Sequence, residues 1–330
     1  MAPRVLHFGK DELLWECREQ NACETYPQGL PQSLEQTLHT NFKSLNPAHY
    51  LTKNAKEGIE MDMTTAAYKV WDTIIWAYSK TSLTVSSDKL IALSGIAKHM
   101  RSITNDEYVA GMWRSRLKYY LLWARIDVQR EGNRSLSSRP TTYRAPTWSW
   151  AATDGDVTMT SVTADSHDSD LGFQVRGLKL EYATEDTTGA ITGGWLDIAG
   201  HLRPMQLHKP NDDAEEDWYM SFNDEIVQLE GFRPSIYLDV PPPNDTAFDV
   251  DNAAQRLFCM GEWPSDSNNW LQLLLFRLKD TQEKLFERIG LAFGICPKGQ
   301  TILFAELDED VERNLPCQSY KNGLHTIRVI

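Results

Sequence analysis

The hydrophobic pattern of this chain changes period near residue 145, and that change limits the folds open to it. In segment 64–79, apolar residues recur every three or four positions, which is typical of a helix that buries one face. After residue 145, short runs alternate between apolar and polar residues and are separated by clusters of turn-forming residues. We therefore expect an α+β fold, with an N-terminal β-hairpin and a helical subdomain packed on an antiparallel β-sandwich or barrel.

Three zones follow from these patterns. Residues 1–60 are expected to form a hairpin, over 4–18, followed by a loop region with one short helix near 33–42. Residues 61–128 are expected to form the helical subdomain, and 145–330 the antiparallel β-rich domain. The expected helices cover 64–79, capped by Thr64 or Thr65, then 87–100, 105–113 and 114–126. The expected strands cover 173–182, 195–202, 218–222, 235–240, 256–262, 270–278, 288–294 and 301–307.

Two tryptophans lie two residues apart just after Pro146 and just before an Asp-Gly turn. On a strand, alternate residues share a face, so Trp148 and Trp150 would point the same way. Two large rings side by side form either part of a core or the wall of a ligand pocket between the zones. The same alternatives hold for the other candidate substrate-binding aromatics, which are Trp71, Tyr78 and Tyr143.

Three polar residues are the candidate catalytic groups. Arg144 either donates two hydrogen bonds to a carbonyl or carboxylate of a ligand, or forms a salt bridge between the helical and β-rich zones. Glu16 and Asp154 serve either as acids or bases, or as capping and ion-pairing groups, and Asp154-Gly155 also has the composition of a hairpin turn.

Composition and motif searches exclude several function classes. The net charge of −13 argues against nucleic-acid and anionic-membrane surfaces, which require clusters of Lys and Arg. Five scattered cysteines without a CxxC pair predict reduced thiols, and no apolar segment is long enough for a signal peptide or membrane span, so we expect a soluble cytoplasmic protein. Neither nucleotide-loop nor metal-ligand spacings occur, and we expect no cofactor and no metal.

Several motifs occur in the order found in one family. They are APRVLHFG at 2–9, LWEC at 14–17, CETYP at 23–27, DKLIALSGIA at 88–97, EYVAGMW at 107–113, LLW at 121–123 and RAPTWSWAATDG at 144–155. This series resembles the region that follows the HET domain in fungal heterokaryon-incompatibility proteins. The resemblance implies that residues 1–60 hold the exit of a HET domain whose TIR-like core would precede Ala2, so no catalytic residue of that core can be transferred to this chain.

Three functions agree with these observations. The first is a small-molecule-binding protein derived from a HET protein, acting as a cofactor-independent cyclase or pericyclase of the Diels–Alder type in fungal secondary metabolism. Such an enzyme preorganises an apolar terpenoid or polyketide in an aromatic pocket and needs only one or two donors to polarise a carbonyl. The second is a self-recognition module in heterokaryon incompatibility without catalytic activity, and the third is an inactive relic. The sequence leaves the oligomeric state open.

Overall fold

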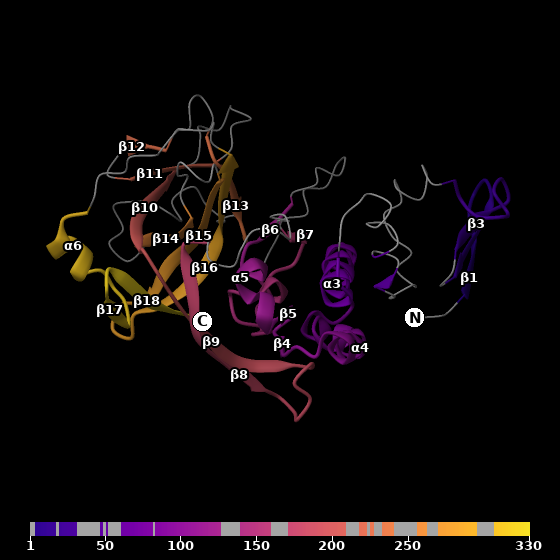
Figure 1. Ribbon diagram of the computed structural model, residues 1–330, viewed down its shortest axis with the longest axis horizontal. Helices are drawn as coiled ribbons and strands as arrows, with labels where there is room; N and C mark the ends of the chain where they lie inside the picture. Colours follow the sequence, from indigo (N-terminus) through magenta and orange to yellow (C-terminus); the bar gives the residue numbers. More distant parts are fainter. Residues whose placement is uncertain are drawn as a thin grey trace. The chain divides into compact units, whose positions relative to one another are not determined.

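The fold, seen in a computed structural model, divides into two compact units (Figure 1). Unit 1 comprises Met1–Tyr78 with Ser102–Asn105, and unit 2 comprises Ser79–Arg101 with Asp106–Ile330. The structure describes residues 4–17, 20–31, 47–48, 51, 61–81, 83–126, 139–159, 171–208, 218–222, 225–227, 233–240, 256–262, 270–295 and 307–330. The expected helix near 33–42 and nearly all of the expected strand 301–307 lie outside these residues.

Unit 1 contains a three-stranded antiparallel sheet and a long helix. The expected hairpin is present as β1 (Arg4–Phe8) and β2 (Leu13–Cys17), and β3 (Asn21–Cys23) extends it on the other side of β2. Helix α3 (Met63–Ser79), whose last residue lies across the boundary of the unit, confirms the predicted helix. Its buried residues include Ala67, Val70, Trp71, Ile74 and Ile75, at the predicted spacing.

The cap of α3 differs from the prediction. The carboxylate of Asp62 accepts a hydrogen bond of 2.6 Å from the backbone N–H of Thr65, so Asp62 caps the helix in place of Thr64 or Thr65. A carboxylate next to the first turn also interacts favourably with the positive end of the helix dipole.

The segment 83–126 of the structure contains less helix than the sequence predicts. Most of the expected helix 87–100 is present, as two short 3₁₀ turns, η1 (Ser86–Asp88) and η2 (Ile91–Leu93), followed by α4 (Ser94–Thr104). The expected helix 105–113 is wrong: this stretch is a tight hairpin of β4 (Tyr108–Val109) and β5 (Met112–Trp113). The turn places Ala110 and Gly111 at φ 49° and 91°, and a helix cannot contain two such residues.

The expected helix 114–126 is also mostly absent. It is replaced by η3 (Arg114–Arg116), one helical turn α5 (Leu117–Tyr120) and a short strand β6 (Trp123–Arg125). β6 pairs with β7 (Val157–Met159), so backbone pairing with a distant segment takes the place of local helix bonds.

The β-rich region confirms the α+β class but not the expected sandwich or barrel. Its strands form one open, mixed sheet of 11 strands, whose main path runs β12-β11-β10-β14-β15-β16-β18-β9-β8. β13 pairs with β16, and β17 pairs with β18. The sheet is mixed because β16 and β18 run parallel. The strands are β8 (Phe173–Tyr182), β9 (Ile191–Gly200), β10 (Arg203–His208), β11 (Tyr219–Phe222), β12 (Glu225–Ile226), β13 (Ser235–Leu238), β14 (Leu257–Glu262), β15 (Trp270–Asp280), β16 (Leu285–Ile295), β17 (Ser319–Lys321) and β18 (Leu324–Val329); the short helix α6 (Glu309–Arg313) precedes β17.

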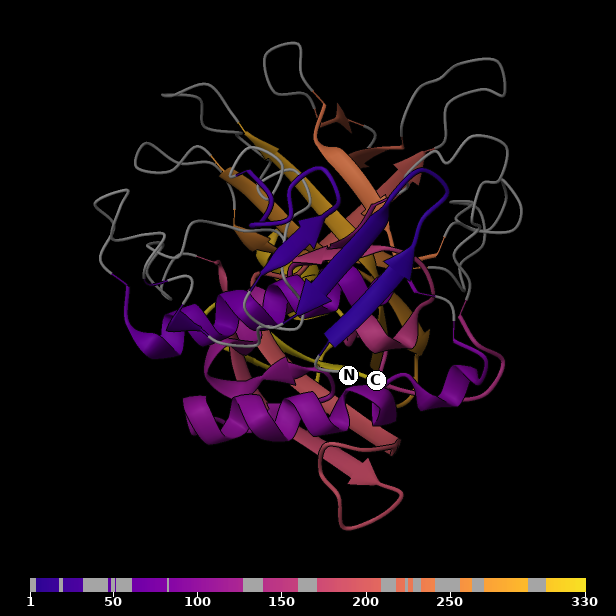
Figure 2. The same cartoon turned by 90° about the vertical axis from the view of Figure 1, so that its right-hand side faces the viewer.

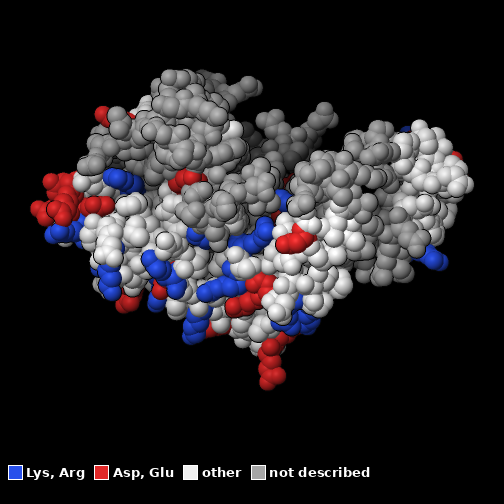
Figure 3. Space-filling view, viewed as in Figure 1, with Lys and Arg blue, Asp and Glu red and all other residues white. Residues whose placement is uncertain are grey.

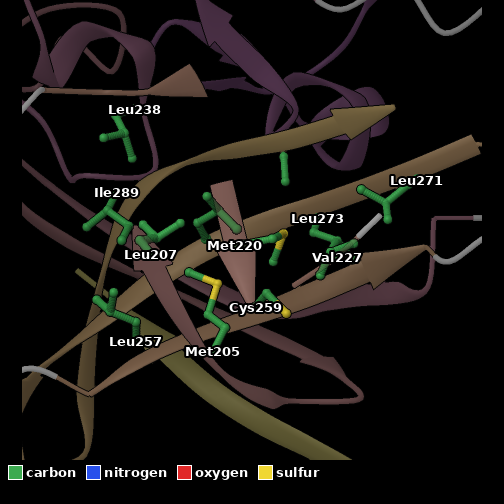
Figure 4. Close-up of a cluster of buried hydrophobic side chains, with 12 residues drawn as sticks. Met205, Leu207, Met220, Val227, Leu238, Leu257, Cys259, Leu271, Leu273 and Ile289 are labelled. Carbon is green, nitrogen blue, oxygen red and sulfur yellow. The ribbon is translucent and has the colours of Figure 1, made fainter. Parts of the chain in front are cut away.

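Both faces of this sheet are buried along its central strands. One face carries a cluster of 12 buried residues, including Leu271, Leu273 and Leu275 of β15 (Figure 4). The next residues along β15, Leu274 and Phe276, are also buried and point to the opposite face, as strand alternation requires. A run of apolar residues buried on both sides is typical of a central strand, and β15 confirms the expected strand 270–278.

On the opposite face, strands that are not neighbours in the sheet come close together. A side chain added at Gly200 of β9 would come within 2.7 Å of Met260 of β14, although three strands separate β9 from β14 in the sheet. Further out, the long β8–β9 ribbon extends beyond the sheet (Figures 1 and 2). Its tip contacts α4, where Asp186 accepts hydrogen bonds from Ser94 and Lys98 at 3.2 and 2.6 Å.

Candidate functional site

The sequence motifs of unit 2 come together in one buried cluster, which we call the motif junction. It consists of hydrogen-bonded residues from four motifs that are separated in the sequence, at 88–97, 107–113, 121–123 and 144–155, together with Ser86. Side-chain hydrogen bonds to backbone carbonyls link these segments to one another.

Trp150 holds the turn between β4 and β5. Its indole N–H donates to the carbonyl of Gly111 at 3.0 Å, and the hydroxyl of Ser149 donates to the carbonyl of Ala110 at 2.7 Å. The ring lies so close to Gly111 that a Cβ there would be 2.6 Å from the indole nitrogen. The glycine is therefore required both for its positive φ and for the space that the ring occupies.

The twin tryptophans do not lie on a strand, which corrects the sequence-based prediction. Ser149 caps a 3₁₀ turn, η4 (Trp150–Ala152), by accepting a 3.0 Å hydrogen bond from the N–H of Ala151. Short polar side chains favour such local bonds over the pairing of a strand, and Pro146 just before them provides no backbone N–H. Both indoles are buried, and the carbonyl of Trp148 accepts a 3.0 Å bond from the indole of Trp123.

Arg144 is bonded entirely within the protein. Its Nε donates to the carbonyl of Ala151 at 2.6 Å. One terminal nitrogen donates to the carbonyl and hydroxyl of Ser86, at 3.0 and 2.8 Å. The other donates to the carbonyl of Thr153 and to the carboxylate of Asp154, at 2.9 and 2.8 Å. A guanidinium has five N–H groups, so the surrounding protein provides an acceptor for each.

Lys89 is a buried cation that the sequence analysis did not select. Its ammonium donates to the carbonyl of Thr153 and lies 5.1 Å from the centre of the Trp150 ring, and only 3% of the residue is exposed. Burial, and secondly repulsion from Arg144, lower the pKa of Lys89 to about 7, although Asp154 acts in the opposite direction. The amine is therefore partly neutral near physiological pH. A lysine within an apolar motif such as 88–97 was the only signal for it in the sequence.

The other predicted site residues are divided between the units. Arg144, Asp154, Trp148 and Trp150 meet at the motif junction, where the side chain of Asp154 remains 46% exposed. Tyr143 precedes Arg144 and is half exposed, and burial of its remaining surface, followed by repulsion from Glu181, raises its pKa to about 12.

The remaining candidates, Glu16, Trp71 and Tyr78, belong to unit 1. Glu16 is hydrogen-bonded to His7 of the neighbouring strand at 3.2 Å. Trp71 is fully buried and Tyr78 is partly buried on α3.

A buried ion pair connects the motif junction to the large sheet. Arg288 of β16 is paired with Asp239, and both side chains are 1% exposed. The guanidinium carbon of Arg288 lies 3.7 Å from the centre of the Trp123 ring, and one nitrogen donates to the Trp123 carbonyl at 2.5 Å. Burial raises the pKa of Asp239 and lowers that of Arg288, and the opposite charge of the partner counteracts both shifts, so each residue depends on the other.

No family model, curated protein or solved structure matches this chain. The resemblance to the post-HET region thus rests on the motifs alone and stays a prediction. Among the described residues, no group of three or more His, Cys, Asp or Glu side chains is arranged to hold a metal ion. None of the helices in the described ranges is long and apolar enough to cross a membrane.

Proposed function

We propose that the chain is a recognition module that binds a second copy of itself through strand β1. The observation that carries this proposal is the exposure of two apolar residues on an edge strand. β1 is the first strand of the three-stranded sheet, and Phe8 and Leu6 on it are 81% and 46% exposed. They are two positions apart, so both lie on the same face as their cross-strand neighbours Leu13 and Trp15.

An edge strand of this kind is suited to pairing with another strand. Its outward N–H and C=O groups have no partner strand in the described part of the sheet, and exposed apolar side chains beside such an edge favour association. Antiparallel pairing of β1 with β1 of a second copy would be symmetric, as in most homodimers. Burying a Phe side chain contributes about 1.5–3 kcal/mol, and the symmetric contact would bury two. The face of the N-terminal sheet that is seen in Figure 3 shows few charged side chains.

The hydrogen bonds of the motif junction are a second argument for a non-catalytic role. The polar groups of Arg144 and the indole N–H of Trp150 bind backbone carbonyls, so these residues stabilise the fold. Because these motif residues are used to maintain the fold, we expect the function of the protein to depend on its surface.

Sedimentation velocity over a range of concentrations tests the proposal. We expect the native chain to form a dimer, and Phe8→Glu to weaken dimerisation at least tenfold because it places a charge in the new interface. The matched control is Val311→Glu in α6, which changes another exposed apolar residue and should leave dimerisation unchanged. Circular dichroism checks that both variants are folded. A native chain that remains monomeric at high concentration, or equal behaviour of the two variants, would contradict the proposal.

The second candidate is the cofactor-free cyclase, with an apolar terpenoid or polyketide as substrate. One observation favours it: the indole N–H of Trp148 is buried and has no hydrogen-bond acceptor. An unpaired donor in an apolar interior can polarise a substrate carbonyl. For this candidate, Arg144 and Asp154 of unit 2 are the catalytic groups, and Tyr143 and Trp150 of the same unit contact the substrate.

Incubation with linear polyene or terpenoid precursors tests this candidate. A cyclase would give a product of the same mass with a changed ring pattern, and Trp148→Phe, which keeps a ring but removes the N–H, would slow the reaction at least tenfold. The matched control is Trp218→Phe, at a partly buried indole that packs against the leucine cluster of the large sheet. Absence of conversion, or an unchanged rate in Trp148→Phe, would refute it.

A further inference from the structure

Four residues from four adjacent strands form a row at one end of the large sheet. Gln272 of β15 lies opposite Glu262 of β14 and Phe293 of β16, and Phe293 in turn lies opposite Ser235 of β13. Strand alternation places Gln272 on the face opposite the leucine cluster of β15. The row is near the ends of its strands, since β14 ends at Glu262 and β13 begins at Ser235 (Figure 1).

Gln272 is a buried amide without hydrogen bonds to the described residues. Only 2% of the residue is exposed, yet neither its Oε1 nor its Nε2 has a hydrogen-bond partner in the part of the chain that the structure describes. Glutamine is rarely buried, and buried polar groups in proteins nearly always have a partner. The missing partners of this amide are therefore expected to come from outside the chain.

Glu262 lies beside Gln272, but the next row on this face of the sheet is apolar. The next row on the same face contains Met260, Leu274 and Leu291, and all three are buried. Next to these apolar side chains, few water molecules compete for the hydrogen bonds of the amide. A ligand that forms these hydrogen bonds is therefore bound strongly and selectively. Among buried side chains, Trp148 and Arg288 each also have one nitrogen without an acceptor, whereas Gln272 has both a donor and an acceptor to offer.

We propose that Gln272 anchors a binding site for a small ligand with a cis-amide edge, such as a lactam or a cyclic imide. A cis-amide has an N–H and a C=O side by side, so it forms two parallel hydrogen bonds with a primary amide: its N–H donates to Oε1, and its C=O accepts from Nε2. The apolar body of the ligand would contact the Leu274 row and the partly buried Phe293. This site is independent of the proposed pairing through β1.

The probe for this site is 5-fluoro-2-pyridone, a planar lactam, and fluorobenzene is the control of similar size without an amide. Binding of both to the full chain is measured by ¹⁹F NMR titration. We expect the pyridone to bind at least tenfold more tightly than fluorobenzene. Gln272→Met has a similar length without an amide and should lose this tenfold preference. The matched control, Gln174→Met on the exposed side of β8, should keep it.

The possible outcomes separate this inference from the proposed function. Equal binding of the two probes, or no binding of either, overturns the ligand site and indicates that water satisfies the amide. A preference for the pyridone that persists in Gln272→Met places the ligand elsewhere and also overturns it. None of these results affects dimerisation through β1, which sedimentation measures separately.

Discussion

Replacement of Lys89 by methionine should change how the stability of the protein depends on pH. The folded-state pKa of Lys89 is about 7 instead of the ordinary 10.5, because the ammonium is buried and lies near Arg144. Between these two values the unfolded chain binds a proton that the folded chain does not. The free energy of unfolding of the native protein therefore rises with pH in this window, by at most ~1.4 kcal/mol per pH unit for this one group.

The magnitude follows from the width of that window. A pKa lowered by about 3.5 units corresponds to a penalty of ~5 kcal/mol for the charged amine, present in full below pH 7. Methionine removes this penalty and also a hydrogen bond to the Thr153 carbonyl, worth ~1 kcal/mol, but Arg144 still donates to that carbonyl. Lys89→Met should therefore be more stable than the native protein at pH 6.5, and its advantage should shrink by about 2–3 kcal/mol by pH 9.

Urea denaturation followed by tryptophan fluorescence at half-unit steps from pH 6.5 to 9.5 measures this difference. Lys179→Met, at an exposed position of β8, is the control, and its stability should run parallel to that of the native protein. A constant difference between Lys89→Met and the native protein across this range would refute the reasoning, since it would mean that Lys89 keeps its charge in the folded state.

Two other substitutions test the packing of unit 2. Gly111→Ala should lower the free energy of unfolding by about 2–4 kcal/mol, because the new side chain would stand at φ 91° and 2.6 Å from the Trp150 ring. The control is Gly95→Ala in α4, which has nothing within 4 Å and should be neutral or stabilising. Thermal melts of both variants measure the difference. Asp239→Asn should lower the free energy of unfolding by about 3–5 kcal/mol, because it leaves the charge of Arg288 buried without its partner. Adding Arg288→Met should recover part of this stability. Urea denaturation measures both variants, and additive losses of stability would show that the two residues are not coupled.

Periodicity identified the elements that bury one continuous face. The predicted strand 173–182 coincides with β8, and the apolar spacing of 64–79 matches the buried side of α3. The predicted strand 270–278 lies within β15, whose apolar run is buried on both faces of the sheet. In these segments the local pattern and the tertiary environment favour the same structure, so the residues alone were sufficient.

Prediction was wrong where distant contacts outweigh local preference. Residues 105–113 were predicted to form a helix, but the indole of Trp150 binds the Gly111 carbonyl and the chain turns there. Residues 148–150 alternate like a strand, but Ser149 caps a 3₁₀ turn. The expected barrel was wrong for a related reason: alternation determines which face a side chain takes, and it does not determine which strands pair.

The amino-acid sequence by itself therefore determined the class of the fold, the long helix, the central strands and the motifs that meet in unit 2. Only the tertiary structure decided the role of those motifs. Whether a polar side chain is hydrogen-bonded within the fold depends on the acceptors that distant segments place next to it. Arg144 finds an acceptor for every N–H, and its charge is used within the fold. Gln272 finds none among the described residues, and the next row on its face is completed by the apolar Met260 and Leu291 of other strands, which no local pattern around residue 272 could show.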